Sequence, residues 1–173
     1  IGSTLTGAYG VLTLNADGQY SYATTASAVD GLAAGATAVD VFTYTVTDGA
    51  LSASAELLIT VTGVNDAPVA VANTNEVPEN GAIDLAAASS VLIDDADVEG
   101  DALTVSAIRT GNVAATDGAQ GEIGSTLTGA YGVLTLNADG QYSYATTASA
   151  VDGLAAGATA VDVFTYTVTD GAL

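Results

Sequence analysis

The chain lacks cysteine, histidine, methionine and tryptophan, and Arg109 is its only basic residue. Without cysteine there are no disulfide bonds, no zinc–thiolate sites and no thiol chemistry. With one basic side chain the protein cannot neutralise a row of phosphates, so nucleic acid is excluded as a partner and an anionic membrane is disfavoured. Since histidine, cysteine, lysine, a G-x-S-x-G turn and a phosphate-binding loop are all missing, we expect no enzymatic activity.

Long apolar runs are also missing. No stretch approaches 18 consecutive apolar residues and the first residues carry no basic segment, so we expect neither membrane insertion nor a secretory signal within this sequence. The 20 acidic residues give a formal net charge of −19, yet 49% of the residues are hydrophobic and can form a core. So acidic a surface is best tolerated where divalent cations screen the carboxylates, which predicts an extracellular location.

An internal repeat dominates the sequence. Residues 1–51 recur without change at 123–173, so the period is 123 − 1 = 122 residues. Such a period is typical of tandem modules. An exact repeat adds length, reach or avidity to a protein. Catalysis needs only one correctly arranged set of active-site residues.

Short alternating segments separated by turns make up almost all of the chain. Asp17-Gly18 and Asp48-Gly49 supply the positive φ that tight turns demand. A helical turn fits only within residues 27–38, and a small-residue loop is expected at 111–121. The alternation predicts strands at residues 11–15, 19–23, 39–47, 54–64, 82–87 and 102–109. About seven or eight strands per period indicate an all-β fold of immunoglobulin-like β-sandwich modules.

The side-chain pattern predicts which residues face the core. In the strand at 54–64, Leu57, Ile59 and Val61 face inward while Thr60 and Thr62 face outward. The aromatic residues could line a sugar-binding face, but their period of two favours packing in the core. They are Tyr20, Tyr22, Phe42 and Tyr44, with copies at Tyr142, Tyr144, Phe164 and Tyr166.

The sharpest break lies at residues 63–68, where a strand ends, an Asn-Asp pair follows, and Pro68 cannot donate to a sheet. We therefore expect residues 1–64 to be the C-terminal part of one module. Residues 65–173 are then the next module without its last strand, the counterpart of Ser52–Val64. Ser52–Val64 of this chain cannot itself serve as the missing last strand of the next module. The linker of about four residues that follows it reaches at most ~14 Å, which is too short. Head-to-tail contact with a neighbouring identical repeat, in the same chain or in a fibre, is expected instead.

Several segments carry a family resemblance. Residues 10–22, 41–49 and 62–68 resemble VCBS repeats, which are tandem modules of giant bacterial adhesins of the RTX type. Val-Pro-Glu-Asn-Gly at 77–81, followed by 91–105, is similar to bacterial cadherin-like repeats. The resemblance implies tandem cadherin-like β-sandwich modules that act as calcium-stiffened extenders on the bacterial cell surface. It also implies type I secretion and a role in cell adhesion and biofilm.

The acidic loop, residues 94–101, carries five carboxylates in eight residues. Asp95, Asp97 and Glu99 alternate before Gly100 and Asp101, so hard oxygen ligands can converge on one Ca²⁺ ion. The spacing matches the first half of an EF-hand loop, whereas the position of the bidentate glutamate is Ser106. The alternative is a solvated acidic turn, in which these carboxylates would repel one another at short range.

The cadherin-like resemblance implies further calcium ligands. It places Asp95 and Asp97 with ligands from the linker, here Asn65 and Asp66, and assigns Glu79 to the junction at the other end of the module. Asp48 and Asp170, each at the end of a strand, are weaker candidates for which an ordinary turn role is expected.

Two functional classes remain open. In the first, the modules are mechanical spacers, either within one adhesin chain or as subunits of a homopolymeric extracellular filament. In the second, each module binds extracellular glycans and repetition supplies avidity.

Overall fold

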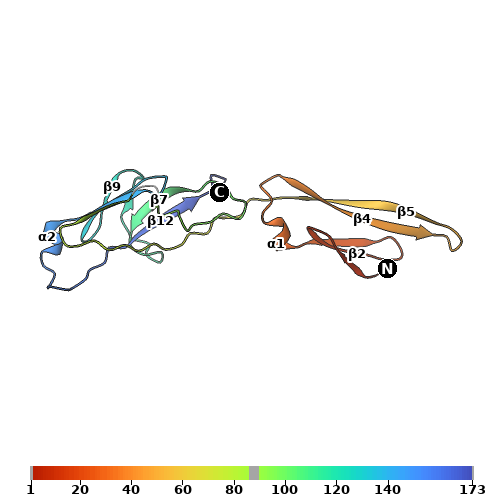
Figure 1. Cartoon of the computed structure of the whole chain (residues 1–173), viewed down its shortest axis with the longest axis horizontal. Helices are drawn as coiled ribbons and strands as arrows, with labels where there is room; N and C mark the ends of the chain where they lie inside the picture. Colours follow the sequence, from red (N-terminus) through yellow and green to blue (C-terminus); the bar gives the residue numbers. More distant parts are fainter. Residues whose placement is uncertain (1, 86–89, 173) are drawn as a thin grey trace. The chain divides into compact units, whose positions relative to one another are not determined.

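A computed structural model describes residues 2–85 and 90–172 of the chain (Figure 1). The chain forms two compact units. Unit 1 comprises Ile1–Asp66 with Val98–Gly100, and unit 2 comprises Ala67–Asp97 with Asp101–Leu173. Strands and turns build both units, so the all-β fold expected from the alternation is confirmed. Helix within the described ranges is limited to two single turns, α1 (Ala26–Val29) and α2 (Ala148–Val151).

Unit 1 contains a three-stranded antiparallel sheet and a long hairpin. The sheet has the order β1-β2-β3, and the hairpin joins β4 to β5 over the whole length of both strands. Gly18 and Gly49, with φ of +85° and +96°, occupy the turns that the two Asp-Gly pairs predict. The strands are β1 (Thr4–Thr6), β2 (Gly10–Leu14), β3 (Tyr20–Thr24), β4 (Thr37–Thr47) and β5 (Ser52–Thr62).

Unit 2 is a two-sheet sandwich. One sheet has the order β6-β11-β10-β9 and the other the order β12-β7-β8. The first sheet uses β6 (Ala82–Leu85), β9 (Thr126–Thr128), β10 (Gly132–Leu136) and β11 (Tyr142–Thr146), and the second uses β7 (Thr104–Thr110), β8 (Gln120–Gly121) and β12 (Phe164–Thr169). β8 falls in the segment expected to be a loop, and residues 86–87 of a predicted strand lie outside the described ranges.

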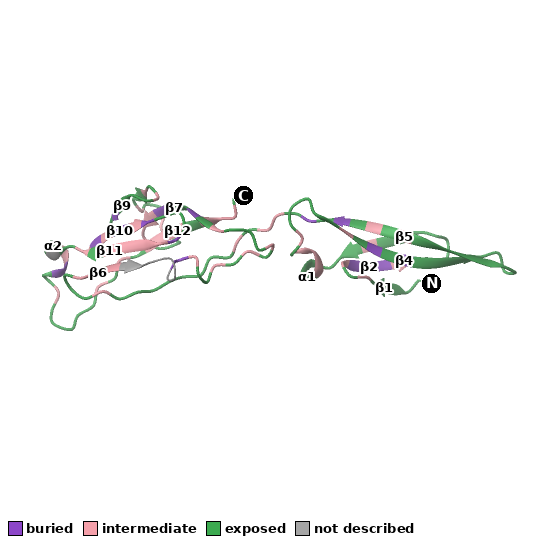
Figure 2. Ribbon diagram, turned by 45° about the horizontal axis from the view of Figure 1, so that its top comes forward, coloured by how far each residue is buried: buried purple, intermediate pink, exposed green. Residues whose placement is uncertain are grey.

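The core of unit 2 lies between its sheets (Figure 2). Alternate residues of β10 point inward, as the period of two requires, whereas the buried residues of β7, Val105 and Ile108, are three apart and the pairing of β7 with β12 shifts its register between them. The predicted aromatic residues pack against the core from β11 and β12, so their assignment to the core is confirmed in this unit. Its buried members are Val91, Val105, Ile108, Leu127, Leu134 and Leu136, flanked by Tyr142, Tyr144, Phe164 and Tyr166.

In unit 1 several side chains of the repeated segment are more exposed to solvent than their copies in unit 2. Leu5 is 53% exposed, whereas its copy Leu127 is 6% exposed. Tyr20 and Tyr44 are 53% and 36% exposed, so the core assignment is wrong for these two side chains. The physical reason is pairing: β11 has β6 beside it and β12 has β7, and the described part of unit 1 has no counterpart of β6 or β7.

The inward face of unit 1 is nevertheless established near its sheet. Phe42 is buried, and its ring meets that of Tyr22 edge-on with centroids 6.3 Å apart. In β5, Val61 is buried, Leu57 and Ile59 are half-buried, and Thr60 and Thr62 are exposed, as predicted. As to the membrane, neither described helix is long and apolar enough to cross one.

Candidate metal site

In unit 2 the first half of the acidic loop, residues 94–97, is fixed to the chain segment that opens the unit. Ala96 and Val69 form an antiparallel bridge, with N···O distances of 2.8 and 3.0 Å. Asp95 Oδ1 accepts a hydrogen bond from the Val71 amide at 2.7 Å. The hydroxyl of Tyr166, on β12, lies 3.3 Å from Asp95 Oδ2. Asp95 therefore joins three segments of unit 2.

The end of the loop is held by a second carboxylate. Asp97 Oδ1 accepts from the amide of Asp101 at 3.0 Å. Gly100 has φ of +81°, a left-handed conformation that glycine adopts without strain. Asp94 Oδ1 lies 3.5 Å from the Asn73 amide nitrogen. These contacts, one to a backbone amide and one between side chains, hold the two ends of the loop.

The candidate ligands of unit 1 form their own arrangement. The Asn65 side-chain amide donates to the carbonyl of Asp66 at 3.0 Å. The Asp66 amide donates to Glu99 Oε1 at 3.0 Å. Glu99 is thus held against the segment where the sequence predicts the linker.

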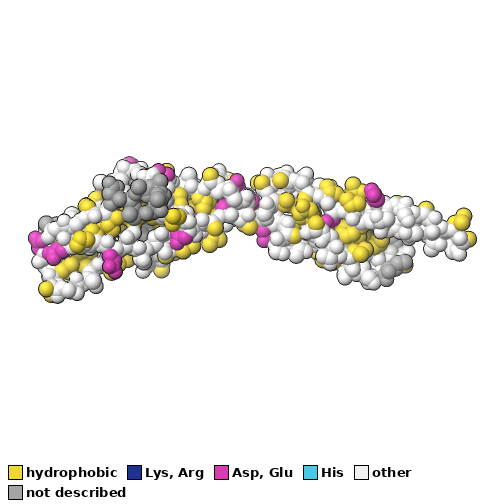
Figure 3. Space-filling view, in the orientation of Figure 1, with side chains coloured by type: hydrophobic (Ala, Val, Ile, Leu, Met, Phe, Trp, Pro, Cys, Tyr) yellow, Lys and Arg dark blue, Asp and Glu magenta, His cyan; other side chains and the backbone are white. Residues whose placement is uncertain are grey.

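Across residues 2–85 and 90–172, no group of three or more carboxylates is gathered as a metal site. Figure 3 shows acidic side chains at several separate places on one face. Glu79 is exposed in the turn before β6, and the carbonyl of Gly81 at the end of that turn accepts from Thr146 on β11. Two contacts between candidates run from a side chain to a backbone amide, Glu99 to Asp66 and Asp97 to Asp101.

The donor chemistry still fits a hard cation. All the candidates offer carboxylate or amide oxygen, which Ca²⁺ prefers. One oxygen of Asp97 and one of Glu99 are almost fully shielded from solvent, and a nearby cation offsets the cost of shielding a charge.

The two weaker candidates have turn roles. Asp48 Oδ1 accepts from the amides of Ala50 and Leu51, both at 2.8 Å. These bonds, Leu51 first, lower the pKa of Asp48. Asp170 Oδ1 accepts from the amide of Ala172 at 2.8 Å. Both are aspartates that close a turn, as expected for this position.

A carboxylate anchor that the sequence pattern did not predict occurs in both units. Asp40, only 3% exposed, accepts from the Ala8 amide at 2.7 Å and from the Tyr22 hydroxyl at 2.7 Å. It also accepts from the Tyr9 amide, 3.2 Å from Oδ2. β4 is thereby clamped to the β1–β2 turn and to β3. The available signal was an aspartate on the apolar alternation of a strand, where a charge demands donors.

Asp162 repeats this anchor in unit 2. Its carboxylate accepts from Ala130 N at 2.7 Å, Tyr131 N at 3.0 Å and the Tyr144 hydroxyl at 2.6 Å. A Cβ atom on Gly129 would lie 2.6 Å from Asp162 Oδ2, so glycine is required there.

The anchors change proton affinities. Burial raises the pKa of Tyr22 to about 12, with help from the hydrogen bond to Asp40. Burial and the hydrogen bond to Asp162 raise the pKa of Tyr144 further. For Asp40, burial favours the neutral acid, but the bonds from Tyr22, Ala8 and Tyr9 outweigh it and lower the pKa. The aspartate therefore stays charged and the tyrosine stays protonated at neutral pH.

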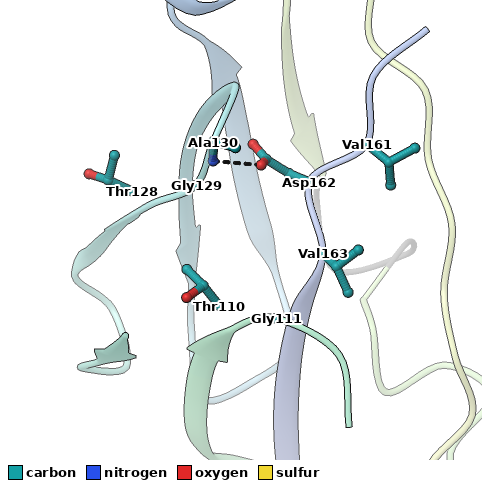
Figure 4. Close-up of a pocket in the computed structure, with 8 residues that line it drawn as sticks. All are labelled: Thr110, Gly111, Thr128, Gly129, Ala130, Val161, Asp162 and Val163. Carbon is teal, nitrogen blue, oxygen red and sulfur yellow. Dashed lines mark hydrogen bonds between the residues drawn. The ribbon is translucent and has the colours of Figure 1, made fainter. Parts of the chain in front are cut away.

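A shallow pocket of about 370 Å³ lies beside the anchor of unit 2 (Figure 4). Asp162 stands at its side, with the bond from Ala130 drawn in the figure. The rest of the lining comes from Thr110, Gly111, Thr128, Gly129, Val161 and Val163. The lining therefore consists of small and β-branched side chains with one carboxylate.

The chain is a tandem of β-sandwich modules. Unit 2 packs two sheets face to face, unit 1 ends in the long β4–β5 hairpin, and both units contain the same carboxylate anchor. The family profile described as bacterial cadherin-like domain matches residues 2–63 and again 65–173. The chain belongs to this family. Membership indicates an extracellular, adhesion-type module. A search of curated proteins gave no match.

Proposed function

We propose that this chain is a spacer segment of a large bacterial surface adhesin, in which repeated modules hold a distant binding domain away from the cell. The observation that carries the proposal is the succession of two cadherin-like domains, at 2–63 and 65–173, with 51 residues repeated unchanged. The resemblance to VCBS repeats adds the finer expectations of an RTX-type adhesin, type I secretion and a role in biofilm. The proposed role requires no enzymatic activity.

Calcium is the second part of the proposal. The oxygen ligands would come from Asp95, Asp97 and Asp101 in unit 2, and from Asn65, Asp66 and Glu99 in unit 1. Bound calcium would neutralise part of a loop that carries five carboxylates. Because the described residues gather no group of three or more carboxylates, the proposal includes a rearrangement of the loop on binding.

Calorimetric titration of the calcium-stripped chain tests this part. We expect a dissociation constant of about 10⁻⁴ to 10⁻³ M, the range of extracellular calcium modules. Asp97→Ala should abolish the strongest binding. Asp117→Ala is the matched control, because it removes the same charge from an exposed residue outside the loop. Equal binding by both variants would place any calcium elsewhere.

Small-angle scattering tests the spacer role. A chain lengthened by one further 122-residue period should gain a fixed increment in maximum dimension in calcium, since each module adds one unit of length. In chelator the increment should shrink as the linkers loosen. A maximum dimension that does not grow with the added period would contradict a spacer.

The two alternatives have direct tests. A filament subunit would assemble into fibres of a single polypeptide, which electron microscopy detects. A glycan-binding module would need an exposed aromatic platform, for which Tyr20 and Tyr44 are the accessible residues. Glycan-array binding that Tyr20→Ala removes would favour that function over the spacer.

A further inference from the structure

One turn of unit 2 combines a reactive pair of residues with an unusual backbone conformation. Asn80 is the only asparagine of the chain that is followed by glycine. Among the residues that the structure describes, it is also the only one other than glycine with a positive φ, +54°. The residue is exposed to solvent. Neither the proposed spacer role nor the proposed calcium site uses it.

The fold requires both members of this pair. The turn runs from Pro78 to Gly81 and is closed by a hydrogen bond from the Gly81 amide to the Pro78 carbonyl at 2.9 Å. Its third residue has a positive φ, which asparagine adopts more readily than most residues with a side chain. At its fourth residue, a Cβ atom would lie 2.8 Å from Pro78 Cγ, so glycine is favoured. A sequence that satisfies this turn is therefore an Asn-Gly pair.

An Asn-Gly pair can modify itself. The backbone nitrogen of Gly81 attacks Cγ of Asn80, and a new C–N bond closes a succinimide ring. The amide proton of Gly81 passes through solvent to the side-chain nitrogen, whose bond to Cγ breaks, and ammonia leaves. Water then opens the ring at either carbonyl and gives aspartate or isoaspartate. Asparagine is a thermolabile residue, and a following glycine, which has no Cβ, leaves the attacking nitrogen uncrowded.

The closed turn opposes this attack. The attacking nitrogen donates its hydrogen to the Pro78 carbonyl, so it keeps that proton until the turn opens, as a protected amide does in hydrogen exchange. The turn is also held by β11, because the Gly81 carbonyl accepts from the amide and from the hydroxyl of Thr146, both at 3.1 Å. The groups that react and the groups that restrain them thus all lie within unit 2.

We propose that Asn80–Gly81 is a self-modification site whose reaction is gated by opening of the turn at residues 78–81. Folded modules keep the asparagine, and modules that open at this turn acquire aspartate or isoaspartate. The substrate is the chain itself and the co-reactant is water. The proposal is independent of the repeat, of calcium and of the spacer role.

The modification prevents the turn from closing as before. Isoaspartate carries the main chain through its Cβ atom, which lengthens the turn by one backbone atom, and either product adds a negative charge beside Glu79. Directly after the turn, Ala82 pairs with Ala145 at the start of β6. A longer turn moves the Gly81 carbonyl away from Thr146 and weakens the pairing of this strand. The product is therefore a lasting record that the edge of the module has opened.

Peptide mapping by mass spectrometry tests the site. The full chain is incubated at neutral pH either folded in buffer or unfolded in guanidinium chloride. Chelator is present in both, so that calcium at Glu79 has no influence. Conversion of the amide to an acid raises the mass of the peptide that contains Asn80, and enzymatic methylation identifies isoaspartate. Asn80→Gly accepts the positive φ and has no side-chain amide, so its peptide should show no gain.

Thr146→Val tests the gate. It removes the hydroxyl that donates to the Gly81 carbonyl while the shape of the side chain is kept. The matched control is Thr24→Val, because Thr24 is the copy of Thr146 in unit 1, at 146 − 122 = 24. Hydrogen exchange at the Thr146 amide, measured before and after ageing, reports whether the modified turn still closes.

We expect Asn80 to react about 10-fold faster or more in the unfolded chain than in the folded chain. In the folded chain, Thr146→Val should speed the reaction by about 3- to 5-fold, the factor that one hydrogen bond contributes, and Thr24→Val should leave it unchanged. An unfolded chain that keeps Asn80 intact would overturn the proposal, since the pair would then not be reactive. Equal rates in the folded and unfolded chains would overturn the gate, and this comparison needs no substitution. Equal rates in Thr146→Val and Thr24→Val would do the same.

Discussion

The Tyr22 hydroxyl donates to the carboxylate of Asp40 at 2.7 Å, and the same bond recurs 122 residues later between Tyr144 and Asp162 at 2.6 Å. Each carboxylate also takes two backbone amides from the turn between the first two strands of the repeat. The anchor thus joins three strands that are distant in sequence. Its presence in both units shows that it forms whether or not a strand such as β5 lies beside it.

Removing the anchor should destabilise the module. Asp162→Ala leaves two amides and one hydroxyl without their acceptor, and hydrogen bonds to a charged group contribute about 1.5–3 kcal/mol. We expect urea unfolding of the full chain to show unit 2 less stable by an amount in this range. Asp152→Ala, at an exposed position just after α2, is the control and should unfold as the unaltered protein does. A similar loss of stability in Asp162→Ala and Asp152→Ala would show that the effect comes from removing any negative charge and not from the anchor.

The anchors also predict a loss of stability in alkali. The pKa of Tyr22 is raised from 10.0 to about 12, so the folded state holds this proton more tightly than the unfolded chain. The stability that this difference contributes is complete below pH 10 and is lost as the pH rises from about 10 to about 12. Tyrosinate absorbance followed together with circular dichroism should show a late-titrating component that Tyr22→Phe reduces, while the part that comes from Tyr144 remains. A single titration curve, identical in the unaltered protein and in Tyr22→Phe, would contradict this prediction.

The repeat offers a test in which one substitution is made in two environments. The Tyr166 hydroxyl donates toward the carbonyls of Val71 and Val91, at 2.9 and 3.1 Å, and accepts from the Asn73 amide at 3.2 Å. Its copy Tyr44 is 36% exposed. We expect Tyr166→Phe to cost about 1–2 kcal/mol and Tyr44→Phe to cost close to zero. Denaturation of the two variants measures the difference, and equal costs would show that Tyr44 is covered in solution.

Features that depend on neighbours in sequence were predictable. The alternation in β5 assigned Val61 to the interior, and Asp48-Gly49 marked the turn before that strand because only a short list of residues accepts positive φ. The all-β class followed from the same local rules. The acidic loop was found because its carboxylates are adjacent in the chain.

Features that depend on distant partners were not predictable. The sequence around Asp40 does not indicate which groups donate hydrogen bonds to it, since Ala8 lies 32 residues earlier and Tyr22 lies 18 residues earlier. The exposure of Tyr44 depends on whether a strand like β7 lies beside β4, which the strand's own sequence does not encode. The same limit applies to the acidic loop, where the spacing suggested convergence but the described residues gather no group of three or more carboxylates.

Chelation should lower the melting temperature. If calcium binds only the folded state, then at 100 times its dissociation constant it adds about 2.7 kcal/mol of stability per site. Thermal unfolding in calcium and in chelator measures this difference. Asp97→Ala should reduce the calcium-dependent part, and Asp117→Ala should retain it. Identical melting of the unaltered chain in both buffers would show that calcium does not stabilise the module.

Identical segments should exchange between molecules when the protein refolds at high concentration. Residues 1–51 of one chain can take the place of 123–173 on β6 and β7 of another, since both segments have the same inward face. Size-exclusion chromatography with light scattering should therefore reveal oligomers after concentrated refolding and monomer after dilute refolding.

Leu5→Asp separates this exchange from unspecific aggregation. Leu5 is 53% exposed in unit 1, so the substitution is tolerated there, whereas its copy Leu127 is 6% exposed in the core of unit 2. A segment that carries aspartate at this position cannot replace 123–173 without burying a charge among Val105, Ile108 and Leu134. We expect the variant to fold normally and to form far fewer oligomers. Oligomers that persist undiminished in Leu5→Asp must arise by a route other than exchange of the repeated segment.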